Sequence, residues 1–348
     1  MNDRIKDAIR GCLIGGAAGD ALGYAVEFVG EPYIVSKYGK DGITAYDLDR
    51  KIGKAIISDD TQMTLFTAAG LINAVRRGTK ENPCREVELA YRDWYETQFS
   101  GYKNAVALMQ AGQLKTHTWL MEVPELWAAR APGNTCLAAL SSLNPTDDYI
   151  AQHRNNRKGC GGVMRVAPVA FYDADIETVD RIAAQCAAIT HGHMLGYQPA
   201  AVLAHVIHRI VFDEMSVRDS VIDARDTLSR VFNLSVERRK LAKLIDLAVE
   251  LSENSEADLA NIHQLGEGWV GEEALAIALY CCLRYENDFS QCIITAVNHN
   301  GDSDSTGAIA GNILGAKVGY EAIGEKWKKE LELNDVIMKT AEELNCLV

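Results

Sequence analysis

Basic charge, strand-like patterning and long apolar runs are all scarce in this 348-residue sequence. Lysine and arginine number 35 against 48 aspartate and glutamate residues, so the formal net charge is -13. A chain this acidic is repelled by phosphate backbones, and we therefore expect no nucleic acid partner. Alternation of apolar and polar residues with a period of two is nearly absent, which argues against a sheet.

The sequence also lacks the patterns of a zinc site, a disulfide framework and a targeting segment. Its nine cysteines form no Cys-x-x-Cys pair and lie mostly in apolar helical stretches, as reduced core thiols do. The apolar run Gly11–Gly19 ends at Asp20 and is too short to span a membrane. The charges before this run do not suit a signal peptide, so we expect a cytoplasmic protein with no membrane partner.

Helical periodicity, by contrast, is abundant. Apolar residues at Ile5, Ile9 and Leu13 follow the spacing of a helix buried on one face. Similar patterns predict helices over Thr61–Arg77, Arg85–Gln98, Thr135–Leu143, Ile176–Ile189, Tyr197–Phe212, Val217–Leu234, Val236–Ser252, Glu272–Tyr285, Phe289–Asn298, Thr306–Tyr320 and Gly324–Leu344. Glycine and proline gather in the expected connectors Gly30–Asp47, Ala131–Asn134 and Asn155–Gly162. No repeat or linker divides the chain, which favours one all-α domain over residues 1–348.

Two acidic clusters lie near opposite ends of the chain, at Ser58–Thr61 and Gly301–Thr306, and each opens a helical pattern. Either cluster alone is explained by helix capping, since serine, threonine and aspartate are preferred N-caps. Together they favour a metal site, because clustered anions need compensation and hard divalent cations prefer oxygen ligands. A calcium loop is excluded, since Ile313 stands where the bidentate glutamate is required.

A stripe of small residues predicts how the two clusters meet. Gly307, Gly311 and Gly315 recur every four residues and therefore line one face of the C-terminal helix. Such a face lets another backbone approach closely. The stripe is too short and too close to acidic residues for a membrane helix, so we expect it to pack against the N-terminal helix.

A glycine-rich loop flanked by cations occupies Arg157–Arg165. Successive unhindered N–H groups can form an anion-binding nest, and neighbouring cations add charge. The loop is not a Walker loop, and Met164 replaces the third glycine of a dinucleotide fingerprint. We interpret it either as a diphosphate site, favoured by the local excess of cations, or as a surface turn.

Three further residues have two interpretations each. Glu27 follows a glycine-bounded helix end, where it is either solvated or orients an attacking water. His191 follows a helix and is either held by backbone or part of a site, but not a zinc pair with His193. Trp269 precedes a predicted helix and is either buried or free to stack on a base.

In their order, these motifs resemble those of the ADP-ribosylglycohydrolase family, which includes dinitrogenase-reductase-activating glycohydrolase and the ADP-ribosyl-acceptor hydrolases. The resemblance spans nearly the whole chain. It rests on Gly19-Asp20-x-Leu22-Gly23 with Glu27, Ser58-Asp59-Asp60-Thr61, Arg130-Ala131-Pro132-Gly133-Asn134-Thr135, Gly159-x-Gly161-Gly162-Val163-Met164-Arg165, Thr190-His191, and Gly301-Asp302-x-Asp304-Ser305.

The resemblance implies a single compact orthogonal helical bundle with a dinuclear Mg²⁺ or Mn²⁺ site at the base of an ADP-ribose cleft. The implied metal ligands are Ser58, Asp59, Asp60, Asp302, Asp304 and Ser305, with Asp304 bridging. The implied substrate-binding residues are Glu27, Lys158, Gly159, Cys160, Gly161, Gly162, Val163, Met164, Arg165 and His191. Glu27 or Asp60 would move the proton. Ser58 and Ser305 stand where many members have threonine, and Cys160 where many have asparagine, which puts the hydrogen bonding of the loop in question.

The implied activity is metal-dependent hydrolysis of the N-glycosidic bond between ADP-ribose and a protein arginine. The implied partners are therefore ADP-ribose and an ADP-ribosylated protein, and we expect a monomer. One alternative is hydrolysis of serine-linked or polymeric ADP-ribose by the same site. A second alternative is a non-catalytic, crystallin-like or ADP-ribose-binding protein, which has no need to keep Asp59, Asp60, Asp302 and Asp304.

Overall fold

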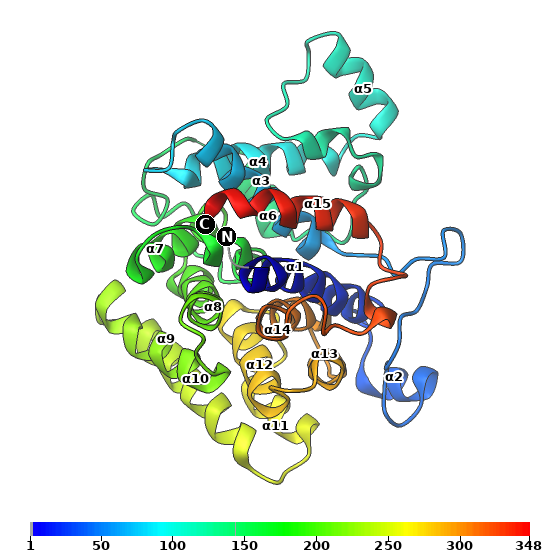
Figure 1. Ribbon diagram of the computed structural model, residues 1–348, viewed down its shortest axis with the longest axis vertical. Helices are drawn as coiled ribbons and strands as arrows, with labels where there is room; N and C mark the ends of the chain where they lie inside the picture. Colours follow the sequence, from blue (N-terminus) through cyan, green and yellow to red (C-terminus); the bar gives the residue numbers. More distant parts are fainter. Residues whose placement is uncertain (1–2, 143) are drawn as a thin grey trace.

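The computed structural model describes residues 3–142 and 144–348, and it is built from helices (Figure 1). In chain order these are α1 Asp3–Tyr24, α2 Glu31–Tyr38, α3 Asp59–Arg76, α4 Pro83–Thr97, α5 Tyr102–Gln110, α6 Asn134–Ser141, α7 Ile176–Ala188, α8 Met194–Phe212, α9 Val217–Val231, α10 Val236–Glu253, α11 Asp258–Leu265, α12 Gly271–Arg284, α13 Phe289–Val297, α14 Ser303–Val318 and α15 Asn334–Leu344. Across the described residues, β-pairing is limited to two isolated bridges, Ala55 with Leu331 and Gly159 with Val270. The all-α prediction is confirmed.

Most predicted helices are present with ends that differ by a few residues, and four predictions need correction. The expected connector Gly30–Asp47 contains α2, while α5 and α11 had no predicted counterpart. The last residue of the predicted helix Thr135–Leu143 lies outside the described residues.

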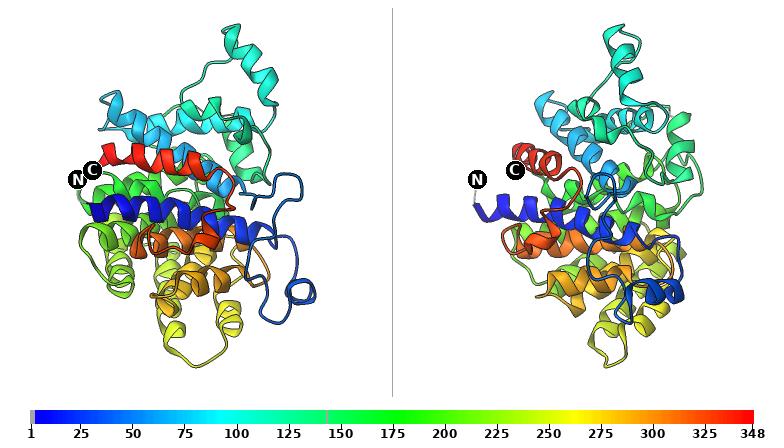
Figure 2. Two further views of the ribbon diagram at one scale, coloured as in Figure 1. Left: turned by 45° about the vertical axis from the view of Figure 1, so that its right-hand side comes forward. Right: turned by 90° about the vertical axis from the view of Figure 1, so that its right-hand side faces the viewer.

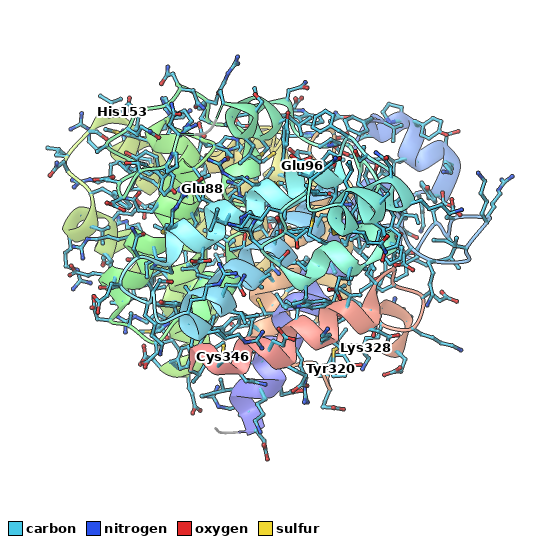
Figure 3. All side chains as sticks on the ribbon, turned by 90° about the horizontal axis from the view of Figure 1, so that it is seen from above. Glu88, Glu96, His153, Tyr320, Lys328 and Cys346 are labelled. Carbon is cyan, nitrogen blue, oxygen red and sulfur yellow. The ribbon has the colours of Figure 1, made fainter. Side chains whose placement is uncertain are left out.

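The fourth correction concerns the predicted helix Gly324–Leu344, of which only a short 3-10 turn and α15 are helical. Between them the chain forms turns around one isolated bridge of Leu331 with Ala55, in which the Glu332 N–H donates to the carbonyl of Ala55 (2.9 Å). The Lys328 ammonium lies over the ring of Tyr320 at 4.4 Å, and Figure 3 shows the two side chains together. The bridge joins the segment before α15 to the segment that leads into α3, and the Lys328 contact joins it to the residues after α14.

Helices α1 and α14 lie side by side through the middle of the molecule (Figure 1). A Cβ atom on Gly311 would lie 2.0 Å from the carbonyl oxygen of Gly15, and one on Gly307 would lie 2.4 Å from that of Gly19. Only glycine allows this approach. The predicted packing of the glycine stripe against the N-terminal helix is therefore confirmed.

The remaining helices cover this central pair. Figure 1 shows α3, α4 and α15 on one side of it and α12, α13 and α11 on the other, with α8, α9 and α10 beside them. Helix α5 stands away from the body, and only Ala105 of its residues is buried. All views place the two termini close together (Figure 2). The packing of α1 against α14 brings the C-terminal end of α1 next to the N-terminal end of α14.

None of the described helices combines the length and the hydropathy that a bilayer span requires.

Candidate functional site

The last turns of α1 fix the start of α3. Asp20 is fully buried on α1, and its carboxylate accepts hydrogen bonds from the N–H groups of Ser58 (3.0 Å) and Thr61 (3.1 Å) and from the Thr61 hydroxyl. Burial raises the pKa of Asp20 to about 6. The sequence showed Asp20 only as part of a glycine motif, although an aspartate inside an apolar helical run was the available signal of a buried, hydrogen-bonded carboxylate.

Ser58 serves as the N-cap of α3, because its hydroxyl accepts from the N–H of Asp60 at 3.1 Å. This arrangement occupies the hydroxyl and leaves the side chains of Asp59 and Asp60 to line a cavity. Asp59 accepts one hydrogen bond, from the N–H of Gly133 at 3.3 Å. Capping and cavity lining are thus shared between neighbouring residues of one cluster.

The start of α14 carries the second acidic cluster. Asp302 caps this helix, accepting from the Ser305 N–H at 3.3 Å, and its other oxygen lies 2.7 Å from the thiol of Cys160, which donates to it. Asp304 also accepts from the Ser305 N–H, at 2.9 Å. The Cys160 thiol therefore forms a hydrogen bond within the site. This is the position at which the resembling family often has asparagine, and at which the hydrogen bonding was in question.

The two clusters and Glu27 meet in one cavity of about 460 Å³. Its lining includes five carboxylates, and no lysine or arginine is found among the described residues around it. The lining residues are Glu27, Phe28, Asp59, Asp60, Ala131, Pro132, Gly133, Asn134, Thr135, Cys136, Gly159, Cys160, Gly161, Met164, His191, Trp269, Asp302, Asp304 and Ser305. Five of the predicted site residues do not line it: Ser58, Lys158, Gly162, Val163 and Arg165.

The carboxylates of this cavity fit a cation site. Glu27, Asp302 and Asp304 each offer an oxygen within 4.8 Å of the others. One oxygen of Glu27 and one of Asp60 are buried without a hydrogen-bond partner. Such groups are unfavourable unless something compensates them, and oxygen-rich sites of this kind suit hard divalent cations.

The pKa values of four carboxyl groups in this cavity are raised, because burial and neighbouring carboxylates disfavour their charged forms. Burial, followed by the charge of Asp302, raises the pKa of Glu27 to about 9. Burial also raises the pKa of Asp59 to about 8, and that of Asp60 and Asp304 well above its ordinary value, with neighbouring carboxylates adding to each. In the absence of a cation, these groups resist ionisation together.

Gly159, Cys160, Gly161 and Met164 of the glycine-rich loop line the cavity, whereas Lys158 and Arg165 do not. Lys158 forms an ion pair with buried Glu272. Arg165 is fully buried; its guanidinium donates to the Thr190 hydroxyl at 2.7 Å and lies 4.4 Å from the ring of Tyr91. The cationic excess seen in the sequence therefore does not line the cavity.

His191 lines the cavity beside this loop, with its Nδ1 atom 2.8 Å from the Thr190 hydroxyl. Burial, with a contribution from Arg165, lowers the pKa of His191 to about 3, so the imidazole is neutral at physiological pH. A Cβ atom on Gly161 would lie 3.0 Å from the ring. The histidine thus packs on the loop and offers one neutral ring nitrogen to a ligand.

Two aromatic residues stand at the same cavity. Phe28 follows Glu27 directly, and Trp269, which precedes α12, is not buried but 42% exposed. Phe28 was not among the predicted site residues, although its position beside Glu27 was the available signal.

A family model described as ADP-ribosylglycohydrolase matches residues 1–347. The chain belongs to the ADP-ribosylglycohydrolase family. The predicted resemblance is confirmed by this match, which spans both acidic clusters and the glycine-rich loop.

The chain is similar to several curated relatives. It is 27% identical over 201 residues to ADP-ribosylhydrolase ARH3 of Homo sapiens, a match that covers 50% of this chain and 54% of that protein, so the chain spans about half the length of this relative. It is 23% identical over 335 residues to ADP-ribosyl-[dinitrogen reductase] glycohydrolase of Rhodospirillum rubrum, covering 94% of this chain and 92% of that one.

A solved structure named ADP-ribosylglycohydrolase-related protein complex shares the fold. The superposition has a TM-score of 0.62 at 21% identity and covers 99% of this chain and 98% of the other. The compact helical fold is therefore that of the family.

Proposed function

We propose that this protein hydrolyses the N-glycosidic bond between ADP-ribose and an arginine side chain of a modified protein. The observation that supports this proposal best is the cavity with five carboxylates and no lysine or arginine among its described lining residues. Such a cavity favours cations, both as metal ions and as the guanidine of the leaving group. The modified protein and free ADP-ribose are the partners proposed here.

Two Mg²⁺ or Mn²⁺ ions are the cofactors that these residues fit. The proposed ligands are those that the family resemblance implies: Ser58, Asp59, Asp60, Asp302, Asp304 and Ser305. All but Ser58 line the cavity, and Ser58 could reach an ion only with a remaining lone pair of its capping hydroxyl. The unpartnered Asp60 oxygen and the proximity of the Asp302 and Asp304 oxygens support the carboxylate members of this set. When bound, such ions supply positive charge that polarises substrate oxygens and lowers the pKa of water.

Glu27 is the residue best placed to handle the proton of the attacking water. Its unpartnered oxygen is buried at the cavity, and its oxygens lie close to those of Asp302 and Asp304. A positive charge in this cluster would lower its raised pKa and make the carboxylate available as a base. Asp60, with the other unpartnered oxygen, is the second candidate for this role.

The loop and the histidine would orient the ADP-ribose. The backbone around Gly159 and Gly161 can donate to a diphosphate without a side chain intervening. Neutral His191 can hydrogen-bond a ribose hydroxyl through its second ring nitrogen. Holding both ends of the substrate in this way fixes the reacting carbon against Glu27 and the carboxylate cluster.

Hydrolysis of serine-linked or polymeric ADP-ribose uses the same features and is the nearest alternative. The two assignments differ at the leaving group, since arginine leaves as a cation and serine as a neutral hydroxyl. Release of free ADP-ribose from arginine-modified and serine-modified versions of one protein, followed by chromatography with Mg²⁺ present, distinguishes them. We expect faster release from the arginine adduct; a clear preference for serine would overturn the linkage assignment.

A non-catalytic, ADP-ribose-binding protein is the third possibility. It would bind ADP-ribose in the same calorimetric titration as an enzyme but release none from any adduct. The unpartnered buried carboxylates argue against it, because pure binding gives no reason to retain them at the cost of stability.

A further inference from the structure

An exposed pair of aromatic rings flanks the carboxylate cavity. The rings of Phe28 and Trp269 have centroids 6.4 Å apart and planes inclined by only 26°. Phe28 is 69% exposed and Trp269 42% exposed, and both line the cavity. Large aromatic side chains held at this exposure beside a polar cavity are suited to contact a ligand.

The position of each ring is set by the site itself. Phe28 is the residue after Glu27, and the carbonyl of Trp269 accepts from the N–H of Cys160 at 3.3 Å. Gly268, directly before the tryptophan, lies against the start of α14. A Cβ atom added to Gly268 would lie 3.4 Å from the Cβ atom of Asp302. The two rings therefore stand next to the carboxylates where the glycosidic bond would be broken. They are positioned by the same segments that carry Glu27, Cys160 and Asp302.

The two rings are loosely stacked on each other. A planar ligand in contact with both faces needs about 7 Å, that is, two contacts of about 3.5 Å each. The ring centroids lie 6.4 Å apart, at the long end of the range over which two rings contact each other directly, so their mutual contact is weak. Both side chains are exposed, so their rotation can separate the ring planes to the distance that a planar group needs.

We propose that Phe28 and Trp269 form an acceptor slot that holds the guanidinium of the substrate arginine. A guanidinium is planar, delocalised and weakly hydrated, and it stacks on aromatic faces as well as being attracted to their π-electrons. The surrounding carboxylates favour a cation over a neutral ring. The inference rests on the proposed function and extends it, because it assigns the residues that select arginine over serine.

Three variants test the slot: Phe28→Ala, Trp269→Ala and Trp269→Phe, the last of which keeps an aromatic face. Phe99→Ala is the matched control, since Phe99 is 62% exposed, contacts the ring of Tyr95 at 4.7 Å and does not line the cavity. For each protein, kcat/KM is measured on an arginine-linked and a serine-linked ADP-ribosyl peptide with Mg²⁺, and the Kd of free ADP-ribose by calorimetry. Circular dichroism checks the fold.

We expect each alanine variant to lose about tenfold in kcat/KM for the arginine-linked peptide, the size of a partly desolvated cation–π contact. The serine-linked peptide and the Kd of ADP-ribose should change little, Trp269→Phe should recover most of the loss, and Phe99→Ala should match the wild type. A weakened ADP-ribose Kd with parallel losses on both peptides would instead assign the slot to the adenine base and overturn the proposal.

Failure of the proposed function is recognised separately, from the wild type. If wild-type protein cleaves only the serine-linked peptide, the linkage assignment is wrong whatever the variants do. The slot is then tested by titrating methylguanidine into the protein saturated with Mg²⁺ and ADP-ribose. Binding that is present in the wild type and lost in Trp269→Ala supports a guanidinium slot, and equal binding or no binding in both rejects it.

Discussion

Removal of divalent cations should make the stability of this protein fall as pH rises. The carboxyl groups of Glu27 and Asp59 have pKa values raised to about 9 and about 8, chiefly by burial, so the folded metal-free protein favours their protonated forms. Their contribution to stability is fully present below the ordinary pKa near 4.5 and 3.8, and it is lost as pH rises through the folded values. A bound cation reverses this trend, because it favours the ionised forms.

The size of the effect follows from the shifts. Each pKa unit corresponds to about 1.4 kcal/mol, and the pKa of Glu27 moves from 4.5 to about 9, so Glu27 alone loses on the order of 5 kcal/mol of stabilisation between pH 5 and pH 9. For a chain of this size, that loss lowers the melting temperature by roughly 10 °C. Saturating Mg²⁺ should stabilise the protein by a larger amount at pH 9 than at pH 5.

The assay is thermal unfolding followed by circular dichroism at pH 5, 7 and 9, with EDTA or with Mg²⁺. Glu27→Gln should reduce the decline in the EDTA series, since an amide does not ionise. Exposed Glu256→Gln is the matched control for loss of one acidic residue elsewhere. A metal-free protein that is as stable at pH 9 as at pH 5, or an Mg²⁺ effect that does not grow with pH, would refute the reasoning.

Three other substitutions have defined outcomes. Asp304→Ala should abolish Mg²⁺-dependent release of ADP-ribose while the helical circular dichroism spectrum is kept, and near wild-type turnover in the variant would remove this residue from the metal site. Gly161→Val should weaken ADP-ribose binding more than Mg²⁺ binding in calorimetric titrations, because even its Cβ atom would meet His191 at 3.0 Å; equal affinities would reassign the loop. Gly311→Ala should lower the free energy of unfolding in urea by about 1–3 kcal/mol, since its Cβ atom would lie 2.0 Å from the Gly15 carbonyl oxygen, whereas Gly101→Ala, with open space around it, should cost less than about 1 kcal/mol.

The features predictable from the sequence are those with a period or a local composition. The spacing of apolar residues predicted most of the helices. The stripe of Gly307, Gly311 and Gly315 predicted that α14 packs against α1. The stripe in turn indicated that the acidic clusters share one site, and the described residues place Asp60 and Asp304 in the same cavity. The family resemblance supplied the residue roles, and the extent of the single domain over residues 1–348 stays a prediction.

The features that could not be predicted depend on contacts between distant segments. Whether Arg165 faces a ligand or the core is decided by its contacts with Tyr91 and Thr190 on other elements, and a count of cations in a loop carries no such information. The segment around Glu332 forms turns and a single bridge to Ala55, although its composition suits a helix. In both places, tertiary contacts override a local pattern.

Metal-dependent cleavage of an ADP-ribose linkage at the carboxylate cavity is the central claim, and one measurement tests it most directly. Purified protein is freed of metal with EDTA, incubated with an arginine-ADP-ribosylated protein, and sampled by chromatography before and after Mg²⁺ is restored. We predict no release of free ADP-ribose in EDTA and steady release once Mg²⁺ is present. Release at the same rate in EDTA, or none in Mg²⁺ or Mn²⁺, would contradict the account.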